Sequence, residues 1–199
     1  MNHISLQQRI ELFNQAYPHL HPLHCDLNDN AKPMICGVWF LGGAKQAEFY
    51  GSYSIEYLRR CETLFQDATK VVHLFCGAMP AGPYTRVGID PSGKGTQPDI
   101  VGDAEKLSSF LPFKADLIYA DPPYTETEAE EKYQISLCNG PKVLSECAQC
   151  LQPGGFVVWL DTRLPVFNNN ELRWVGEIVY IRSTGNRIRG ISIFQKPLK

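Results

Sequence analysis

The amino-acid sequence predicts an α/β fold with one mostly parallel sheet that closes in an antiparallel hairpin. Two observations predict this fold. From Lys70 onward, short apolar runs alternate with helical patterns, which is typical of parallel strands joined by crossovers. Near the end of the chain, the apolar runs 174–182 and 188–196 flank a polar segment, 183–187, which indicates a hairpin.

Composition limits the kind of protein that the chain forms. Its 199 residues, 44% of them hydrophobic, suit one globular domain. A net charge of -2 and a pI near 6.2 argue against a protein that coats nucleic acid by bulk charge, although a local basic patch stays open. Seven cysteines without regular spacing and an N-terminus without an apolar signal predict a reduced, cytoplasmic protein. The longest uncharged stretch, 33–44, is too short to span a bilayer, so no membrane partner is expected.

The first part of the chain predicts a helical extension, residues 1–52, packed on a core of residues 53–199. Apolar residues at helical spacing predict a helix over 6–17 that ends before Pro18. The loop 19–25 holds three histidines and a cysteine, and a further cysteine lies at position 36. Their spacing matches no metal-ligand template, so no metal site is expected. The apolar segment 36–43 predicts a short strand or a packing segment.

The core opens with a helix capped by Ser54, and strands then follow in succession. We expect strands at 71–77, 86–91, 99–104 and 115–120, a short helix at 105–110, a helix beginning at Pro141 and a strand at 156–160. The segment 125–134 is polar and acidic and predicts a loop or an exposed helix start. Arg86 follows Gly77 by nine positions (86 − 77), which is short for a crossover helix. We therefore expect a trimmed sheet whose bare face is covered by the N-terminal helices.

The segment Asp121-Pro122-Pro123-Tyr124 follows the most apolar strand and suggests a reaction at an amino group. The nitrogen of an amine attached to a ring or carbonyl is a poor nucleophile, because its lone pair is delocalised. The carboxylate of Asp121 and the carbonyl of Pro122 could each accept one of its N–H groups and free that lone pair. Prolines fix φ and hold these acceptors in place, and Tyr124 offers a ring for stacking. The plainer interpretation is a βα turn in which the prolines only end the strand.

Further polar positions follow the predicted strand ends at Gly77, Asp90 and Asp103. In open α/β sheets, ligands bind beyond the carboxyl ends of the strands, where the strand order reverses. Asp90 could accept hydrogen bonds from a ribose diol, and Asp103 could accept them from an adenine amino group.

These segments resemble class I S-adenosylmethionine-dependent methyltransferases, which have a Rossmann-like sheet, in the branch that methylates exocyclic amino groups and includes the DNA adenine methyltransferases. The resemblance implies S-adenosyl-L-methionine as the cofactor. It assigns catalysis to Asp121, Pro122, Pro123 and Tyr124, and cofactor binding to Tyr53, Phe75, Cys76, Gly77, Asp90, Asp103, Ala104 and Asp121. Residues 151–156 are similar to a conserved turn of that family. The chain departs from the pattern at Leu74 and Met79, where the family usually has an acid and a second glycine.

The resemblance implies a nucleic-acid substrate, with adenine in DNA ranked before a base in RNA, and with a protein amide or a free base left open. No separate recognition domain fits in the chain, so a protein partner for target recognition is compatible with it. Arg182 and Arg187 are candidate nucleic-acid contacts, whereas the acidic residues after Tyr124 would repel a phosphate backbone. The altered Gly77 turn leaves one other hypothesis, a catalytically inactive binding protein with this fold. Cys147 and Cys150 have redox spacing, but their helical position predicts packing.

Overall fold

The computed structural model describes residues 4–27, 31–41, 53–89, 97–133, 136–182 and 188–198. In chain order the elements are α1 (Leu6–Ala16), β1 (His24–Leu27), β2 (Pro33–Leu41), α2 (Ile55–Leu64), β3 (Val71–Leu74), β4 (Thr85–Gly88), β5 (Ile100–Val101), the 3₁₀ helix η1 (Ala104–Ser109), β6 (Ala115–Ala120), α3 (Glu126–Glu128), the π-helical turn η2 (Ala129–Tyr133), α4 (Gly140–Cys150), β7 (Leu151–Asp161), β8 (Arg173–Arg182) and β9 (Ile188–Gln195). None of the described helices is long and apolar enough to cross a membrane.

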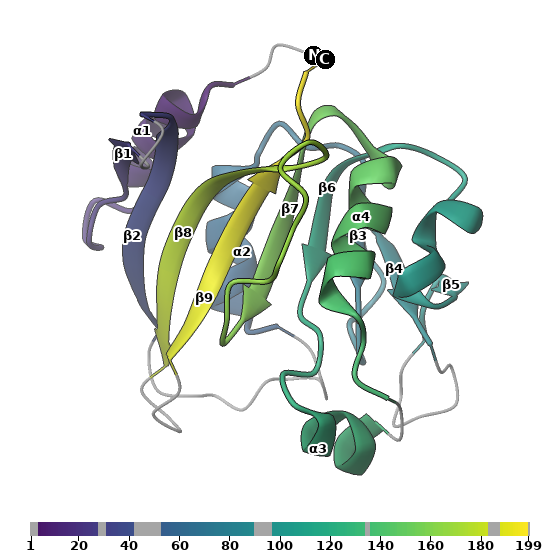
Figure 1. The fold of residues 1–199 in the computed structure, drawn as a ribbon. Coiled ribbons are helices and arrows are strands. Elements are labelled where there is room, and N and C mark those ends of the chain that lie inside the picture. The colour runs from purple at the N-terminus through teal and green to yellow at the C-terminus, as the bar shows by residue number, and fades with distance from the viewer. Residues whose placement is uncertain are drawn as a thin grey trace.

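The strands form one sheet in the order β1-β2-β8-β9-β7-β6-β3-β4-β5 (Figure 1). Strands β2 to β8 run parallel to one another, while β9 is antiparallel to both of its neighbours and β1 is antiparallel to β2. Counted from β3 as the first strand of the core, the order is 3-2-1-4-5, the arrangement of nucleotide-binding α/β folds, and the β8–β9 hairpin follows it. The predicted α/β sheet with its closing hairpin is confirmed.

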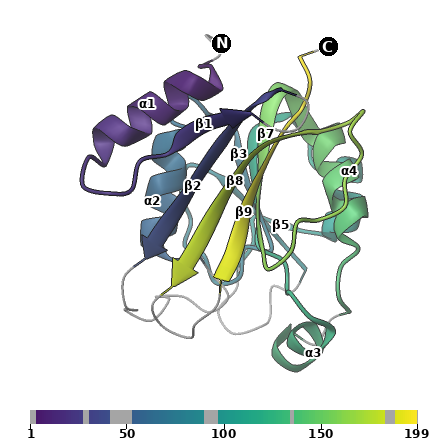
Figure 2. The same cartoon turned by 60° about the vertical axis from the view of Figure 1, so that its left-hand side comes forward.

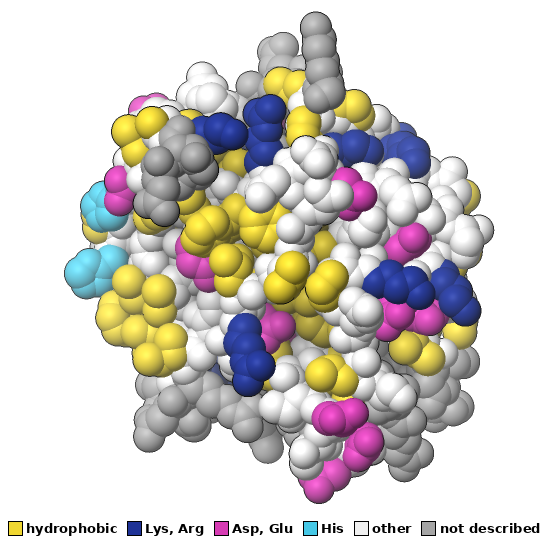
Figure 3. Space-filling model, viewed as in Figure 1, with side chains coloured by type: hydrophobic (Ala, Val, Ile, Leu, Met, Phe, Trp, Pro, Cys, Tyr) yellow, Lys and Arg dark blue, Asp and Glu magenta, His cyan; other side chains and the backbone are white. Residues whose placement is uncertain are grey.

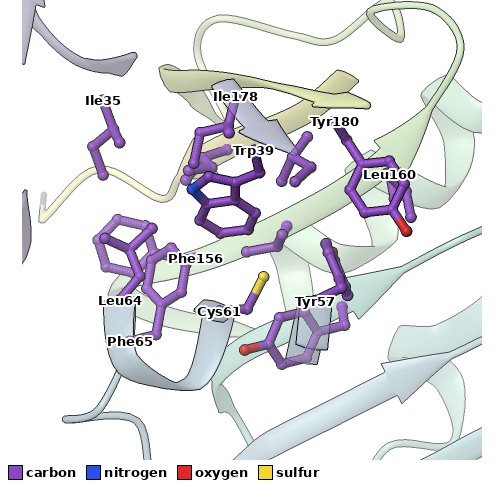
Figure 4. Packing of buried hydrophobic residues seen from close by; sticks show 14 of the residues in the cluster. Ile35, Trp39, Tyr57, Cys61, Leu64, Phe65, Phe156, Leu160, Ile178 and Tyr180 are labelled. Carbon is purple, nitrogen blue, oxygen red and sulfur yellow. The ribbon is translucent and has the colours of Figure 1, made fainter. Parts of the chain in front are cut away.

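Helices cover the two faces of the sheet, with α1 and α2 on one side and α4 on the other (Figure 2). Ser54 caps α2 as expected, because its hydroxyl accepts the Tyr57 N–H. The buried face of α2 packs across the sheet: Cys61 and Leu64 lie against Trp39 and Phe156 in one cluster (Figure 4). This contact joins the first strands of the chain to the middle of the sheet.

The opposite face is packed by α4, which has Pro141 in its first turn as the sequence predicts. Val143 and Leu144 are buried in a second cluster that includes Ile118. The Cys147 side chain is fully buried in the same cluster, which confirms that this cysteine serves packing.

Residues 24–41 depart from the expected loop and short segment. His24 begins β1, and β2 is a nine-residue strand whose Ile35 pairs in register with Gly176 of β8. The sheet therefore gains two strands from residues that the sequence places in the extension. The division of the chain at residue 52 stays a prediction.

The shortened connections after β3 and β4 contain no helix in their described residues, as the spacing indicated. The N-terminal helices do not compensate over β4, since the cluster under α1 and α2 includes no residue of β4 or β5. Arg86 of β4 is buried beside these connections. Its guanidinium donates to Asp99 at 2.8 Å and to the Met79 carbonyl at 2.8 Å, and its pairing with Asp99 lowers the pKa of that carboxyl. Arg86 thus ties the connections before and after β4 to each other.

Candidate functional site at the carboxyl edge

The carboxyl ends of β2, β3, β4, β6, β7 and β8 meet along the lower edge of the sheet in Figure 1, because these strands are parallel. The chain leaves β3 toward β4 and β5 and then returns to β6 on the other side of β3. The strand order therefore reverses between β3 and β6. In open α/β sheets this reversal is the place where ligands bind.

Two of the predicted motifs lie at this reversal. Leu74, the last residue of β3, pairs in register with Ala120, the last residue of β6. Phe75 and Asp121 are therefore the next residues on adjacent strands. The structure brings the Phe75–Gly77 turn and the Asp121–Tyr124 segment together, as the sequence predicted for one rim.

The Phe75–Gly77 turn has an unusual backbone. Phe75 has φ 54° although it carries a side chain, and Gly77 has φ 52°. A side chain at such an angle costs on the order of 1–2 kcal/mol, and strain of this kind gathers at ligand sites. Cys76 lies between them. Its side chain is buried, and its backbone N–H donates to the Val87 carbonyl at 3.3 Å. The turn is thus anchored to β4 through its middle residue.

Asp121 and Tyr124 contact each other directly. The Tyr124 hydroxyl donates a hydrogen bond to the Asp121 carboxylate. Burial, together with the negative charge of Asp121, raises the pKa of Tyr124, so the phenol stays protonated and remains a donor. This bond orients the carboxylate with respect to the ring. Pro122 is buried and Pro123 is half-buried, which is consistent with a stiff segment.

Tyr53 approaches the same place from the residues before α2. Its ring is buried and stacks on Tyr57 with 5.3 Å between the centroids. The Tyr53 ring also lies 5.7 Å from the ring of His73 on β3 and 6.3 Å from that of Tyr119 on β6, measured between centroids. Burial first, and then the charges of Asp121, Cys61 and Cys76, raise the pKa of Tyr53. Tyr53 therefore lies beside the two strands that lead into the predicted motifs, and its role in cofactor binding stays a prediction.

His73 is a neighbour of the site that sequence reasoning did not assign. It is buried on β3, with its ring 4.7 Å from Tyr119 and 4.6 Å from Tyr84, and its Nδ1 has no hydrogen-bond partner. Burial lowers its pKa from 6.5 to about 3, so the imidazole is neutral. The sequence offered one signal for this residue, a histidine inside an otherwise apolar predicted strand.

The other predicted site residues lie farther along the edge or outside the described residues. Asp103 is exposed two residues beyond β5, and its carboxylate caps η1 by accepting the Glu105 N–H at 2.9 Å; Ala104 beside it is buried. Arg182 is half-buried at the end of β8. Asp90 and Arg187 lie outside the described residues, so their predicted roles stay predictions.

Arg189, in contrast, enters the site directly. Its guanidinium lies 4.9 Å from the centroid of the Tyr124 ring and 5.8 Å from that of Tyr180. The sequence shows an arginine near the hairpin but not which strand register brings it to Tyr124. Among the described residues, no group of three His, Cys, Asp or Glu side chains could hold a metal ion.

Comparison with known proteins gives a fold similarity only. No family model matches the chain, and no curated protein matches it. TrmN from Thermus thermophilus is 18% identical over 64% of this chain and 44% of its own, with a TM-score of 0.44. A putative SAM-dependent methyltransferase from Streptococcus mutans is 13% identical over 72% of this chain and 50% of its own, with a TM-score of 0.43. This chain thus spans half or less of either protein. At these scores the similarity assigns no function, and the fold assignment stands on the strand order.

Proposed function

We propose that this protein is an S-adenosylmethionine-dependent N-methyltransferase acting on an exocyclic amino group. One observation carries the proposal: the Asp121–Tyr124 segment lies beside the strained Phe75–Gly77 turn, at the point where the strand order reverses. The fold alone supports a ligand site there. The residue types support an amine as the reacting group.

The described residues fit the cofactor. Its sulfonium is a cation, and cations bind favourably beside carboxylates and aromatic faces. The Asp121 carboxylate and the buried ring of Tyr53 supply such an environment. Gly77, with its positive φ and no Cβ, suits close approach of a ligand to the backbone. We assign Phe75, Cys76 and Gly77 to this approach and Asp103 and Ala104 to the adenine. When bound, the cofactor supplies an electrophilic methyl group.

The protein's own part in the reaction is to hold and prepare the amine. The carboxylate of Asp121 and the carbonyl of Pro122 accept its two N–H groups, which draws the nitrogen toward tetrahedral geometry. The new N–C bond would form as the S–C bond to that methyl group breaks, with its electron pair left on the sulfur of a neutral thioether. One N–H proton then leaves the nitrogen, is held at the Asp121 carboxylate and passes to water. Catalysis by this route is mainly a matter of position, and the two prolines keep the acceptors from moving.

The substrate that we rank first is adenine in DNA, followed by a base in RNA and then by a protein amide. The ranking rests on the Asp121–Tyr124 motif, with Arg182 at the same edge as a candidate phosphate contact. Tyr124 supports a flat substrate, because an aromatic ring stacks on any base.

A second candidate is a binding protein without turnover. The observation that favours it is the state of Tyr124: its hydroxyl is bonded to Asp121 and its ring faces Arg189. The Tyr124–Asp121 hydrogen bond and the contact of Arg189 with the Tyr124 ring would both have to break before a substrate could enter.

The test is incubation of the protein with radiolabelled S-adenosylmethionine and pools of DNA, RNA and protein. We expect label in one nucleic-acid pool. Asp121→Ala should reduce labelling more than 100-fold, in the range that loss of oriented catalytic groups costs. It should change the affinity for S-adenosylhomocysteine only slightly, because this ligand has no sulfonium charge for the Asp121 carboxylate to bind. Calorimetry measures the affinity for S-adenosylhomocysteine.

Glu11→Ala is the matched control, because Glu11 is an exposed acid on α1, away from the carboxyl edge. It should leave both quantities unchanged. Equal loss of labelling and of cofactor affinity in Asp121→Ala would contradict the separate roles assigned here. Absence of label with intact cofactor binding would favour the binding protein.

A further inference from the structure

Arg189 holds a position that the proposed reaction does not use. It is the second residue of β9, and β9 is antiparallel to β8, so it lies at the same edge as the carboxyl ends of the parallel strands. Its guanidinium lies over Tyr124, the ring to which we assign substrate stacking.

Arg189 forms no ion pair within the described residues. No carboxylate there lies within ion-pair distance of its guanidinium, and its Nε is buried without a hydrogen-bond partner. A nearby acid, Asp161, is engaged elsewhere, since its carboxylate accepts the Trp159 indole N–H at 3.2 Å and the Thr162 N–H at 2.6 Å. A buried donor without an acceptor is unfavourable, because its lost hydration is not replaced. Such a donor fits a ligand that brings an acceptor.

We propose that Arg189 determines specificity for a nucleotide: it covers Tyr124 in the free protein and donates to a phosphodiester oxygen when a base takes its place. This inference rests on the proposed function, because it takes Tyr124 as the stacking ring. A guanidinium and a base are both planar, and one face of a ring holds only one of them. Arginine binds phosphate well through its fork of N–H donors, so the displaced side chain gains an acceptor.

The same geometry disfavours a neutral protein amide. Such a substrate would displace Arg189 from Tyr124 and supply no anionic oxygen for it.

The charges along the carboxyl edge also suggest the path of a bound nucleic-acid strand. Elements α3 and η2 carry three exposed acids that would repel phosphates: Glu126, Glu130 and Glu131. Acidic side chains show at the bottom of the face viewed in Figure 3. Arg182 lies at the end of β8, the strand paired with β9. We therefore place the phosphates on the hairpin side.

The experiment measures fluorescence anisotropy of labelled single-stranded DNA and RNA oligonucleotides against salt concentration. For Arg189→Ala we expect at least tenfold weaker binding and a salt slope smaller by about 0.7, the value for one phosphate contact on a single strand. Arg189→Lys keeps the charge and should retain the slope while losing part of the affinity. Arg173→Ala is the matched control, because Arg173 is an exposed arginine at the opposite end of β8. It should bind within twofold of the wild type.

The outcomes separate this inference from the proposed function. Oligonucleotide affinity and salt slope that are unchanged in Arg189→Ala would overturn the inference, even if methyl transfer is intact. Binding of an amide peptide in place of oligonucleotide by the wild type would overturn it as well. If Arg189→Ala weakens oligonucleotide binding but no pool is ever labelled, the inference stands and the proposed methyl transfer fails. Thermal unfolding of each variant shows that the fold is retained.

Discussion

His73 shows how one side chain ties stability to pH. It is neutral in the folded protein, because burial lowers its pKa from 6.5 to about 3. Below pH 6.5 the unfolded chain binds a proton that the folded chain does not bind. Stability must therefore fall as pH decreases from 6.5 toward 3.

We expect the wild type to lose about 2 kcal/mol of unfolding free energy between pH 7.5 and pH 5 through His73, at 1.4 kcal/mol per unit of pKa difference. His73→Phe keeps an aromatic ring beside Tyr119 and should lose correspondingly less. Urea denaturation at the two pH values measures the difference. Equal losses in wild type and variant would show that His73 does not stay neutral.

At the scale of elements, one buried ion pair fastens α1 to the end of α2. The Arg9 guanidinium donates to both carboxylate oxygens of Asp67, at 2.6 and 2.7 Å, and to the Leu64 carbonyl at 3.0 Å. It also lies 4.8 Å from the centroid of the Phe156 ring. Burial alone would raise the pKa of Asp67, but the bonds and charge of Arg9 outweigh it, and the net shift is downward.

Removal of Asp67 would leave a buried cation without a partner. We expect Asp67→Ala to lower the unfolding free energy by about 3 kcal/mol, the lower end of the range for a broken buried pair, since Asp67 is partly exposed. Chemical denaturation tests this. Lys142→Ala is the control: it removes the exposed cation of the Lys142–Glu105 pair, in which the Lys142 side chain is 52% exposed, and should cost about 0.5 kcal/mol. Similar costs for the two variants would refute the role given to Arg9.

At the scale of the whole molecule, the sequence predicted the features that depend on local pattern. Apolar runs located β3, β4 and β6, and the polar segment 183–187 located the hairpin. The Asp121–Tyr124 and Phe75–Gly77 segments were predicted to share a rim because parallel strands end on the same edge, and the register of β3 with β6 brings them together.

What the sequence left open depends on pairing between distant segments. The partner of β2 is β8, far along the chain, and no local pattern in 33–41 shows this pairing. The contact of Arg189 with Tyr124 likewise depends on how β9 aligns relative to the loop after β6. The pairing of Arg86 with Asp99, thirteen residues apart, likewise depends on how the loop after β4 folds back.

Part of one sheet face is exposed to solvent in the described residues. Phe40 of β2 and Ile188 of β9 are 56% and 64% exposed, and hydrophobic side chains show on the face viewed in Figure 3. No helix lies over this part of the sheet in the described residues, because the connection from β7 to β8 contains none.

The central claim is that the reversal between β3 and β6 binds S-adenosylmethionine, and calorimetric titration with S-adenosylhomocysteine tests it most directly. We expect the wild type to bind S-adenosylhomocysteine saturably. Gly77→Ala should weaken that binding, because a side chain at φ 52° costs on the order of 1–2 kcal/mol, equivalent to about tenfold in affinity if the turn shifts. Absence of heat at millimolar ligand with a folded protein would contradict the account.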